Sequence, residues 1–131
     1  MATTSFAGQL LSLRLASAGP VALRSHYYFG RLDYLMLIRV VRMTFTPAQV
    51  PAFLALFAAT KDQIRAQPGC LRLELWQDAD QPHIYCTHSH WGSPAALDAY
   101  RHSALFGRVW PATKRLFAAP PLAFSSQMVQ M

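Results

Sequence analysis

The stretch Trp91-Gly-Ser-Pro-Ala-Ala-Leu-Asp-Ala-Tyr-Arg-His-Ser-Ala-Leu-Phe-Gly-Arg-Val-Trp110 decides the fold. Ser93 followed by Pro94 is typical of a helix start, because serine caps free amide groups and proline is tolerated in the first turn. Ser103 offers a second cap within the same stretch. The pattern therefore predicts two helical segments, the second of which Pro111 should kink or stop.

Two strands are expected before this stretch. Residues 84–90 form a strand-like run, and in residues 70–77 leucines alternate with arginine, glutamate and tryptophan. Alternation with a period of two is typical of a half-buried strand. Residues typical of turns fill positions 78–82. Together these runs predict an antiparallel hairpin.

Three further elements complete the pattern. Residues 36–45 carry apolar residues at both odd and even positions, as expected for a strand that is covered on both faces. Thr46 and Pro47 then predict a capped helix over residues 47–66, and alternation over 122–128 predicts a last strand. The order β-α-β-β-α-β predicts a ferredoxin-like α+β fold, with one antiparallel sheet and the helices on one face.

The sheet face without helices also needs a cover. An apolar first strand with an uncovered side is most simply buried by the same side of a second copy. The sequence therefore predicts a homodimer that pairs through the sheet faces.

Composition limits the other partners. The 131 residues are 53% hydrophobic and 14% charged, which fits one globular domain. The formal charge is +6, but the arginines are scattered, so no nucleic-acid partner is expected. No apolar run approaches the roughly 20 residues that span a bilayer, so no membrane partner is expected either. The two cysteines suggest free thiols in a reducing cytoplasm.

Residues 1–35 differ from the remainder of the chain. They carry no acidic residue before Asp33 and are rich in serine, alanine and arginine, which is typical of a transit peptide. The alternative that we favour is an extension outside the domain core, with residues 10–15 able to form a short helix or an added strand. The domain itself is predicted over residues 36–131.

The chain resembles the antibiotic biosynthesis monooxygenase domain family, within the dimeric α+β barrel superfamily. The resemblance covers about residues 36–129. It rests on the first strand and on the following motifs: Pro68-Gly69-Cys70, Trp91 followed by Ser93, Ala96 and Leu97, the His102-Ser103 step, and Phe106. It implies a pocket between the helices and the concave side of the sheet, in a protein that pairs as a dimer.

The resemblance also implies an activity. The family includes oxygenases that need no cofactor and relatives that degrade haem. The first kind implies a monooxygenase that oxidises a flat aromatic or quinol-like molecule with O2 and no cofactor. The haem-degrading pattern needs asparagine, tryptophan and histidine at positions that hold Val41, Tyr100 and Trp110 here, so no axial haem ligand is expected. A non-catalytic dimer that binds a small hydrophobic molecule is the alternative.

Four aromatic residues are candidates to line the pocket and stack a flat ligand: Trp91, Tyr100, Phe106 and Trp110. Phe106 has helical spacing, so it fits ordinary core packing as well. Tyr100 and His102 are the candidate catalytic residues. A histidine at the pocket mouth could remove a phenolic proton, since it is largely neutral near pH 7. Alternatively, Ser103 caps a helix and His102 is solvated.

Arg39 and Arg42 are candidates to bind an anionic or phenolate oxygen of the ligand. They have opposite parity on the first strand, so one should face the pocket and the other the dimer side. The alternative role is a salt bridge between subunits, for instance to Glu74.

Cys86, His88 and His90 share one face of their strand, where two histidines could chelate a metal with Glu74 as a further ligand. A one-residue shift in register would move all three to the other face. The alternative is a polar row on the dimer side of the sheet. No Ser-His-Asp order or glycine-rich phosphate loop occurs, which argues against the commoner hydrolases and nucleotide-binding proteins.

Overall fold

The computed structural model describes residues 36–131, and the expectations for residues 1–35 lie outside this part of the chain. Its four strands are arranged in the order β2-β3-β1-β4, and all neighbours are antiparallel. This topology confirms the predicted ferredoxin-like α+β fold. The elements are β1 (Leu37–Thr44), η1 (Pro47–Gln49), α3 (Val50–Arg65), β2 (Cys70–Gln77), β3 (Ile84–Trp91), α4 (Pro94–Arg101), α5 (Ala104–Lys114) and β4 (Leu122–Gln127).

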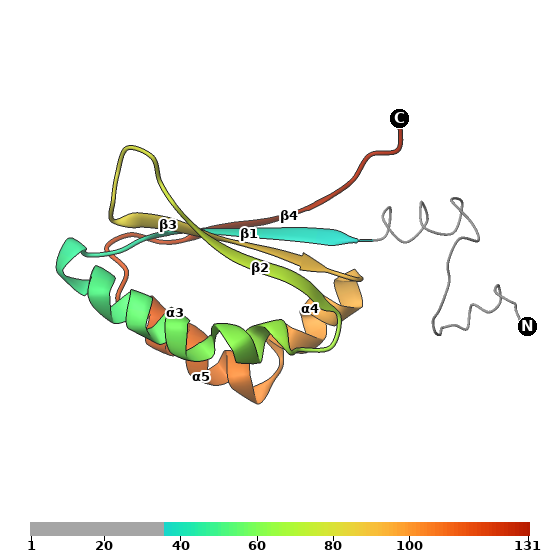
Figure 1. Cartoon of the computed structure of the whole chain (residues 1–131), viewed down its shortest axis with the longest axis horizontal. Coiled ribbons are helices and arrows are strands. Elements are labelled where there is room, and N and C mark those ends of the chain that lie inside the picture. Colours follow the sequence, from blue (N-terminus) through green and yellow to red (C-terminus); the bar gives the residue numbers. More distant parts are fainter. Residues whose placement is uncertain (1–35) are drawn as a thin grey trace, which may run out of the picture. The chain divides into compact units, whose positions relative to one another are not determined.

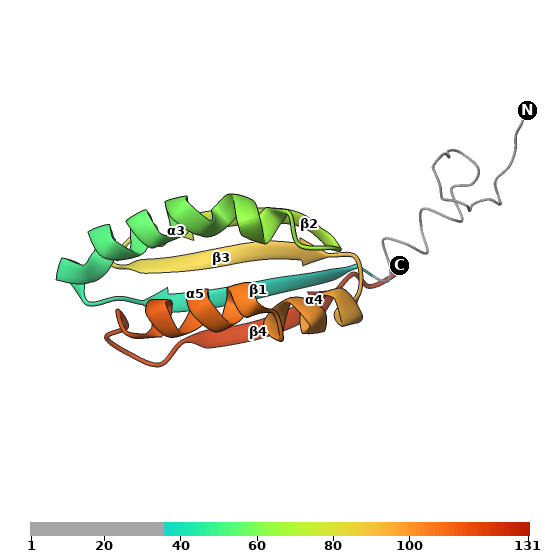
Figure 2. The same ribbon diagram turned by 90° about the horizontal axis from the view of Figure 1, so that it is seen from below.

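All three α-helices of residues 36–131 cover the same face of the sheet (Figures 1 and 2). Helix α3 lies along β2 and β3, while α4 and α5 run along β1 and β4 (Figure 2). The opposite face, which we call the outer face, carries no helix of residues 36–131 (Figure 1). None of the helices in this range is long and apolar enough to cross a membrane.

Aromatic packing anchors α3 on the sheet. Phe45 is 0% exposed and stacks on Phe53, with 4.1 Å between ring centroids. Tyr85 of β3 and Met43 of β1 complete this cluster. Stacked and edge-to-face ring pairs add about 0.5–1.5 kcal/mol to the free energy of area burial, so the end of the sheet near Phe45 is firmly packed.

A second cluster joins α4 to the other end of the sheet. Trp91 is 1% exposed and packs with Leu37 and Leu97. Its indole Nε1 donates a hydrogen bond of 2.9 Å to Ser89 Oγ, so the buried indole N–H is satisfied. The end of β3 and the first turn of α4 are thus held together.

The predicted serine caps are confirmed. Ser93 Oγ accepts from the amide of Ala96 at 3.1 Å, and Ser103 Oγ accepts from the amide of Phe106 at 3.1 Å. Thr46 behaves differently, because its side chain makes no capping bond. Its carbonyl accepts from Gln49 N at 2.8 Å, which closes the short helix η1 before α3 begins.

The expectation that Pro111 stops the second helical segment is wrong, since α5 continues through Pro111 to Lys114. Proline removes the bond to the carbonyl four residues earlier, which here belongs to Gly107. Both Gly107 and Pro111 are exposed, so water can satisfy that carbonyl. The loss falls near the helix end and leaves the final turn intact.

Gly69 is needed at the turn into β2. Its φ of +83° is in the left-handed region, and a Cβ at this position would lie 2.4 Å from Ala96 Cβ. Its carbonyl accepts from Gly92 N at 2.8 Å, which ties this turn to the end of β3. Any larger residue would strain the backbone and push α4 away from the sheet.

We therefore expect Gly69→Ala to lower the free energy of unfolding by about 3 kcal/mol, from left-handed strain and overpacking together. Gly107→Ala is the matched control, because a Cβ there meets nothing within 4 Å. In the helix, alanine should raise stability by about 0.5–1 kcal/mol. Urea unfolding at one protein concentration measures both, and equal effects would contradict this account of Gly69.

Candidate functional site: a pocket between helices and sheet

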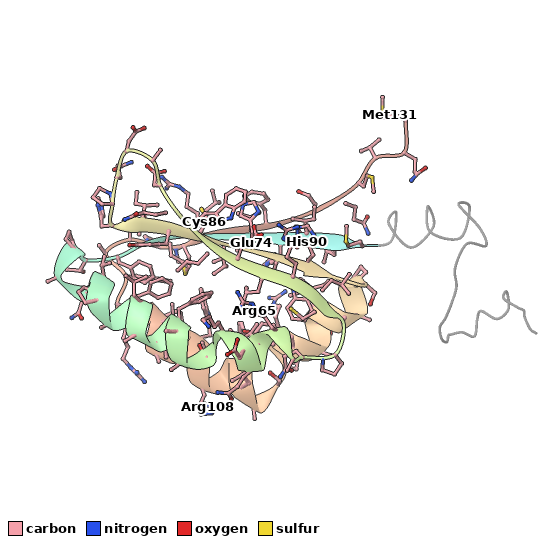
Figure 3. The ribbon with its side chains drawn as sticks, in the orientation of Figure 1. Arg65, Glu74, Cys86, His90, Arg108 and Met131 are labelled. Atoms are coloured by element: carbon pink, nitrogen blue, oxygen red, sulfur yellow. The ribbon has the colours of Figure 1, made fainter. Side chains whose placement is uncertain are left out.

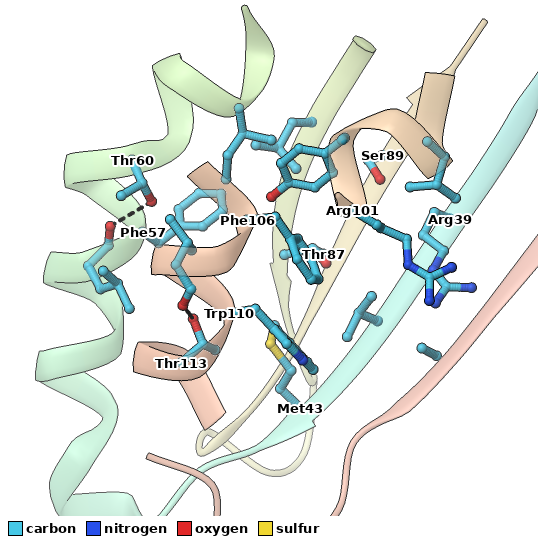
Figure 4. A pocket seen from close by; sticks show the side chains of 18 of the residues that line it. Arg39, Met43, Phe57, Thr60, Thr87, Ser89, Arg101, Phe106, Trp110 and Thr113 are labelled. Atoms are coloured by element: carbon cyan, nitrogen blue, oxygen red, sulfur yellow. Dashed lines mark hydrogen bonds between the residues drawn. The ribbon is translucent and has the colours of Figure 1, made fainter. Parts of the chain in front are cut away.

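A cavity of about 180 Å³ lies between the three helices and the sheet (Figure 4). Every strand and every α-helix of residues 36–131 contributes to its wall. The lining residues are Arg39, Val41, Met43, Phe53, Leu56, Phe57, Thr60, Ile64, Leu73, Thr87, Ser89, Trp91, Leu97, Tyr100, Arg101, Phe106, Val109, Trp110, Thr113 and Ala123.

One wall is a continuous row of aromatic rings. Trp91 stacks on Tyr100 at 5.1 Å between centroids, Tyr100 meets the edge of Phe106 at 5.2 Å, and Phe106 stacks on Trp110 at 5.9 Å. The four predicted aromatic residues are therefore brought together at the pocket. Trp91 is fully buried, whereas Phe106 and Trp110 keep partly exposed faces that a flat ligand could contact.

The hydroxyl groups of the helices contribute little polarity. Thr60 donates to the Leu56 carbonyl and Thr113 to the Val109 carbonyl, each at 2.8 Å within its own helix. Ser89 accepts the indole N–H of Trp91. The side of the pocket near α3 is thus predominantly apolar.

Two arginine side chains, Arg39 and Arg101, supply the positive charge in the pocket. Their guanidinium groups converge at the side of the pocket near β1 (Figure 4). Arg39 Nη1 donates to Ser125 Oγ on the neighbouring strand β4 at 3.0 Å. Burial, and then the charge of Arg101, lowers the pKa of Arg39 from its ordinary value. Among residues 36–131 no aspartate, glutamate, histidine or lysine lines the pocket.

Tyr100 places its phenol ring in the aromatic row. Burial, with a smaller contribution from Cys70, raises the pKa of Tyr100 to about 12. The phenol therefore keeps its proton at neutral pH, where it can donate a hydrogen bond but cannot act as a base.

The expectation that His102 lies at the pocket mouth is wrong. Its side chain is 77% exposed, and its Nδ1 lies 2.9 Å from the carbonyl oxygen of Asp98 and 3.7 Å from the Asp98 carboxylate. Residues two apart on a helix point about 200° away from each other. Because Tyr100 faces the pocket, His102 at the end of α4 faces solvent. This agrees with the alternative interpretation, in which Ser103 caps a helix and His102 is solvated.

The two arginines of β1 lie on opposite faces of the sheet, as their odd and even positions in the strand predict. Arg39 lines the pocket, whereas Arg42 lies on the outer face with Nη2 3.8 Å from the Asp78 carboxylate. Arg42 does not line the pocket, so of these two arginines only Arg39 is placed to contact a ligand there. Glu74, the suggested partner for a salt bridge between subunits, accepts from Arg72 Nε at 2.7 Å within its own chain.

The hairpin register places Cys86, His88 and His90 on the outer face, across from Trp76, Glu74 and Arg72 respectively. Glu74, Cys86 and His90 lie on the sheet, away from the exposed Arg108 on α5 (Figure 3). The His88 ring stacks on Trp76 at 3.8 Å, and Arg72 lowers the pKa of Glu74. Within the described range no three potential ligands gather, so the metal alternative is not supported.

Arg101 was not identified from the sequence as a pocket residue. It is adjacent to Tyr100, so on a helix it lies only about 100° around the axis from a residue that was expected to face the pocket. That angle allows contact with the pocket edge but does not require it. The apolar residues of α3 and Thr87 of β3 were likewise missed, because their spacing fits ordinary core packing equally well.

Comparison with known proteins identifies the family of the chain. A family model described as antibiotic biosynthesis monooxygenase matches residues 36–110. The chain therefore belongs to the antibiotic biosynthesis monooxygenase family. A search of curated proteins finds no match.

Solved structures show the same fold at low identity. A conserved protein from Methanosarcina mazei Go1 superposes with a TM-score of 0.71 at 19% identity, over 76% of this chain and 97% of the other. A protein named antibiotic biosynthesis monooxygenase gives 0.68 at 21%, over 72% and 99%. A protein from Bacteroides thetaiotaomicron VPI-5482, described as of unknown function and "possible oxidoreductase", gives 0.66 at 12%, over 72% and 99%.

The raised pKa of Tyr100 makes stability depend on pH in the alkaline range. An unfolded tyrosine loses its proton near pH 10, whereas folded Tyr100 holds it to about pH 12. The unfolded chain therefore binds fewer protons in this interval, and the free energy of unfolding should fall as the pH rises from about 10 to about 12. Tyr100→Phe should show a smaller fall.

Urea unfolding at a series of pH values measures this effect, with Tyr85→Phe as the matched control. Ultraviolet difference spectra between wild type and Tyr100→Phe should place the tyrosinate signal of Tyr100 near pH 12. A signal near pH 10 would contradict the burial of its hydroxyl.

Proposed function

We propose that this protein is a homodimeric, cofactor-independent monooxygenase that oxidises a small phenol or quinol with O2. The observation that supports this proposal best is the open pocket, which has an aromatic wall and two arginines as the only charged residues of its described lining. Aromatic rings stack a flat substrate, and guanidinium groups favour its anionic, electron-rich form. Family membership agrees with this activity.

The proposed reaction balances without a cofactor. A phenolate transfers electrons to O2 and forms a C–O bond at a ring carbon that carries hydrogen, the para carbon in a phenol or an ortho carbon in a quinol. Loss of the C–H proton and cleavage of the O–O bond leave a quinone carbonyl, and the second oxygen atom departs as water. The sum is phenol plus O2 giving quinone plus water, or quinol plus O2 giving hydroxyquinone plus water. In both cases the ring loses four electrons and O2 gains four.

The initial proton has no protein acceptor within the described lining. A guanidinium group only donates hydrogen bonds and cannot take up a proton, and Tyr100 is protonated below about pH 12. In the proposal the guanidinium charges lower the pKa of the bound phenol, and water at the pocket mouth takes the proton. A rate profile should therefore follow the pKa of the substrate and not that of a histidine.

The size of the cavity limits the substrate. An apolar cavity of about 150 Å³ is enough to hold benzene, and typical sites for drug-sized ligands start near 300 Å³. At about 180 Å³ the pocket fits one aromatic ring with its substituents, or two rings if part of the ligand protrudes.

The outer face supports the dimer in this proposal. Four large apolar side chains of the strands are strongly exposed: Leu71 at 62%, Trp76 at 52%, Leu122 at 61% and Phe124 at 46%. The strand register places the last three on the outer face. An exposed apolar face of this kind is typical of an interface between subunits.

A non-catalytic dimer that binds an aromatic ligand is the second candidate. The specific observation in its favour is the lack of a general base among the described pocket residues. Binding without oxygen consumption would select this candidate over the enzyme.

Turnover can be tested with one-ring and two-ring phenols and quinols in an oxygen electrode. We expect uptake of one O2 per product, with a single labelled oxygen in the product when ¹⁸O2 is supplied. Ala123→Phe, which fills the pocket from β4, should lower kcat/KM at least about 10-fold, because the substrate ring loses its space.

Two controls accompany this test. Ala99→Phe adds the same ring at an exposed position of α4 outside the pocket, and His102→Ala removes the solvated histidine. Both should keep kcat/KM within about twofold of wild type. Unlabelled product with release of H2O2 would contradict monooxygenation, and a large loss in His102→Ala would restore that residue as a candidate base.

The dimer can be tested independently. Phe124→Glu should convert the dimer to a monomer, because a buried, unpaired carboxylate is strongly unfavourable in an apolar interface. Leu54→Glu on α3 is the matched control, since Leu54 is similarly exposed but lies on the helix side. Light scattering after gel filtration measures the mass. A dimer that survives Phe124→Glu and dissociates in Leu54→Glu would place the interface on the helices.

A further inference from the structure

The two pocket arginines are a pair of like charges without an acidic neighbour in the described lining. No ion pair joins Arg39 or Arg101 to a carboxylate within residues 36–131. Both groups come from rigid elements, the central strand β1 and the last turn of α4. Like charges held close together in a partly apolar site repel each other unless an anion lies between them.

Arg39 is also held in place by its surroundings. Its side chain crosses to β4, where Nη1 donates to Ser125 Oγ at 3.0 Å. A guanidinium group has five N–H donors, so this bond leaves donors for a ligand. The other polar groups nearby are hydroxyls, which cannot neutralise the two cations.

We infer that the substrate of the pocket is an aromatic carboxylic acid, whose carboxylate binds between Arg39 and Arg101 while its ring extends toward Phe106 and Trp110. A carboxylate matches the planar guanidinium group geometrically and can accept from both arginines through its two oxygens. The partly exposed rings of Phe106 and Trp110 provide a stacking surface beyond the arginine pair (Figure 4). One ring with a carboxylate also matches the cavity of about 180 Å³.

This inference deepens the proposed function by naming the substrate class, and it depends on that function only for turnover. The same carboxylate would fix which ring carbon faces O2, because it anchors one end of the ring. Neutral quinols of the same size would lack this anchor.

The experiment compares two probes on the full chain, 2,5-dihydroxybenzoate and 2,5-dihydroxybenzamide. They share the ring and both hydroxyl groups, and the neutral carboxamide replaces the carboxylate with a group of similar size. Binding is measured anaerobically by calorimetry, so that turnover does not interfere. We expect the carboxylate to bind at least about 10-fold more tightly than the amide, since charge-assisted hydrogen bonds are the stronger kind.

The variants Arg39→Gln and Arg101→Gln should each remove most of this preference, because they remove the charge that the carboxylate binds. Arg108→Gln is the matched control, because it removes the same charge from an exposed position of α5 outside the pocket. It should keep the preference. Equal affinity for both probes in wild type would overturn the inference. So would an equal loss in Arg108→Gln, which would assign the preference to net charge.

Failure of this inference is distinguishable from failure of the proposed function. Tight, arginine-dependent binding of the carboxylate without oxygen uptake supports the ligand class and contradicts the enzyme. Oxygen-dependent conversion of quinols with no preference for the carboxylate supports the enzyme and contradicts the ligand class.

Discussion

The pleat of β1 is the constraint on which the remaining structure depends. This strand lies between β3 and β4, so its residues alternate between the pocket and the outer face. Arg39, Val41 and Met43 therefore line the cavity, while Arg42 lies on the other side near Asp78. A shift of one residue in its pairing would exchange the two sets and place Arg42 beneath the helices. The anchoring of Phe45 on Phe53 at the end of β1 holds this register.

Much of the fold was predictable because its signals are local. The serine caps before α4 and α5 and the alternation of Leu73 and Leu75 with Glu74 and Trp76 in β2 each depend on a few neighbouring residues, and the structure agrees with them. Leu71 departs from this alternation, because it lies at a shift in register and is 62% exposed. Pro111 was misjudged because its effect depends on where the freed carbonyl points. Exposure of Gly107 is a tertiary property that no local pattern reveals.

The site was predictable only in part, for a geometric reason. Tyr100, Phe106 and Trp110 were recognised because large aromatic side chains at helical spacing must find a common face. The angular position of the following residues around α4 is set by how that helix packs on Trp91. That rotation brings Arg101 to the pocket edge and carries His102 into solvent, and it cannot be derived from composition or spacing alone. An open cavity, in the same way, depends on the summed volumes of many side chains.

The placement of the three tryptophans makes the molecule suited to optical measurement. Trp91 is sealed in the core, Trp110 borders the cavity, and Trp76 lies half-exposed against the His88 ring on the outer face. Each indole therefore reports a different event: unfolding, occupation of the cavity, or contact at the outer face. Replacing two of the three with phenylalanine would leave one emitter, so the intrinsic fluorescence of a single chain could follow these processes separately without an attached label.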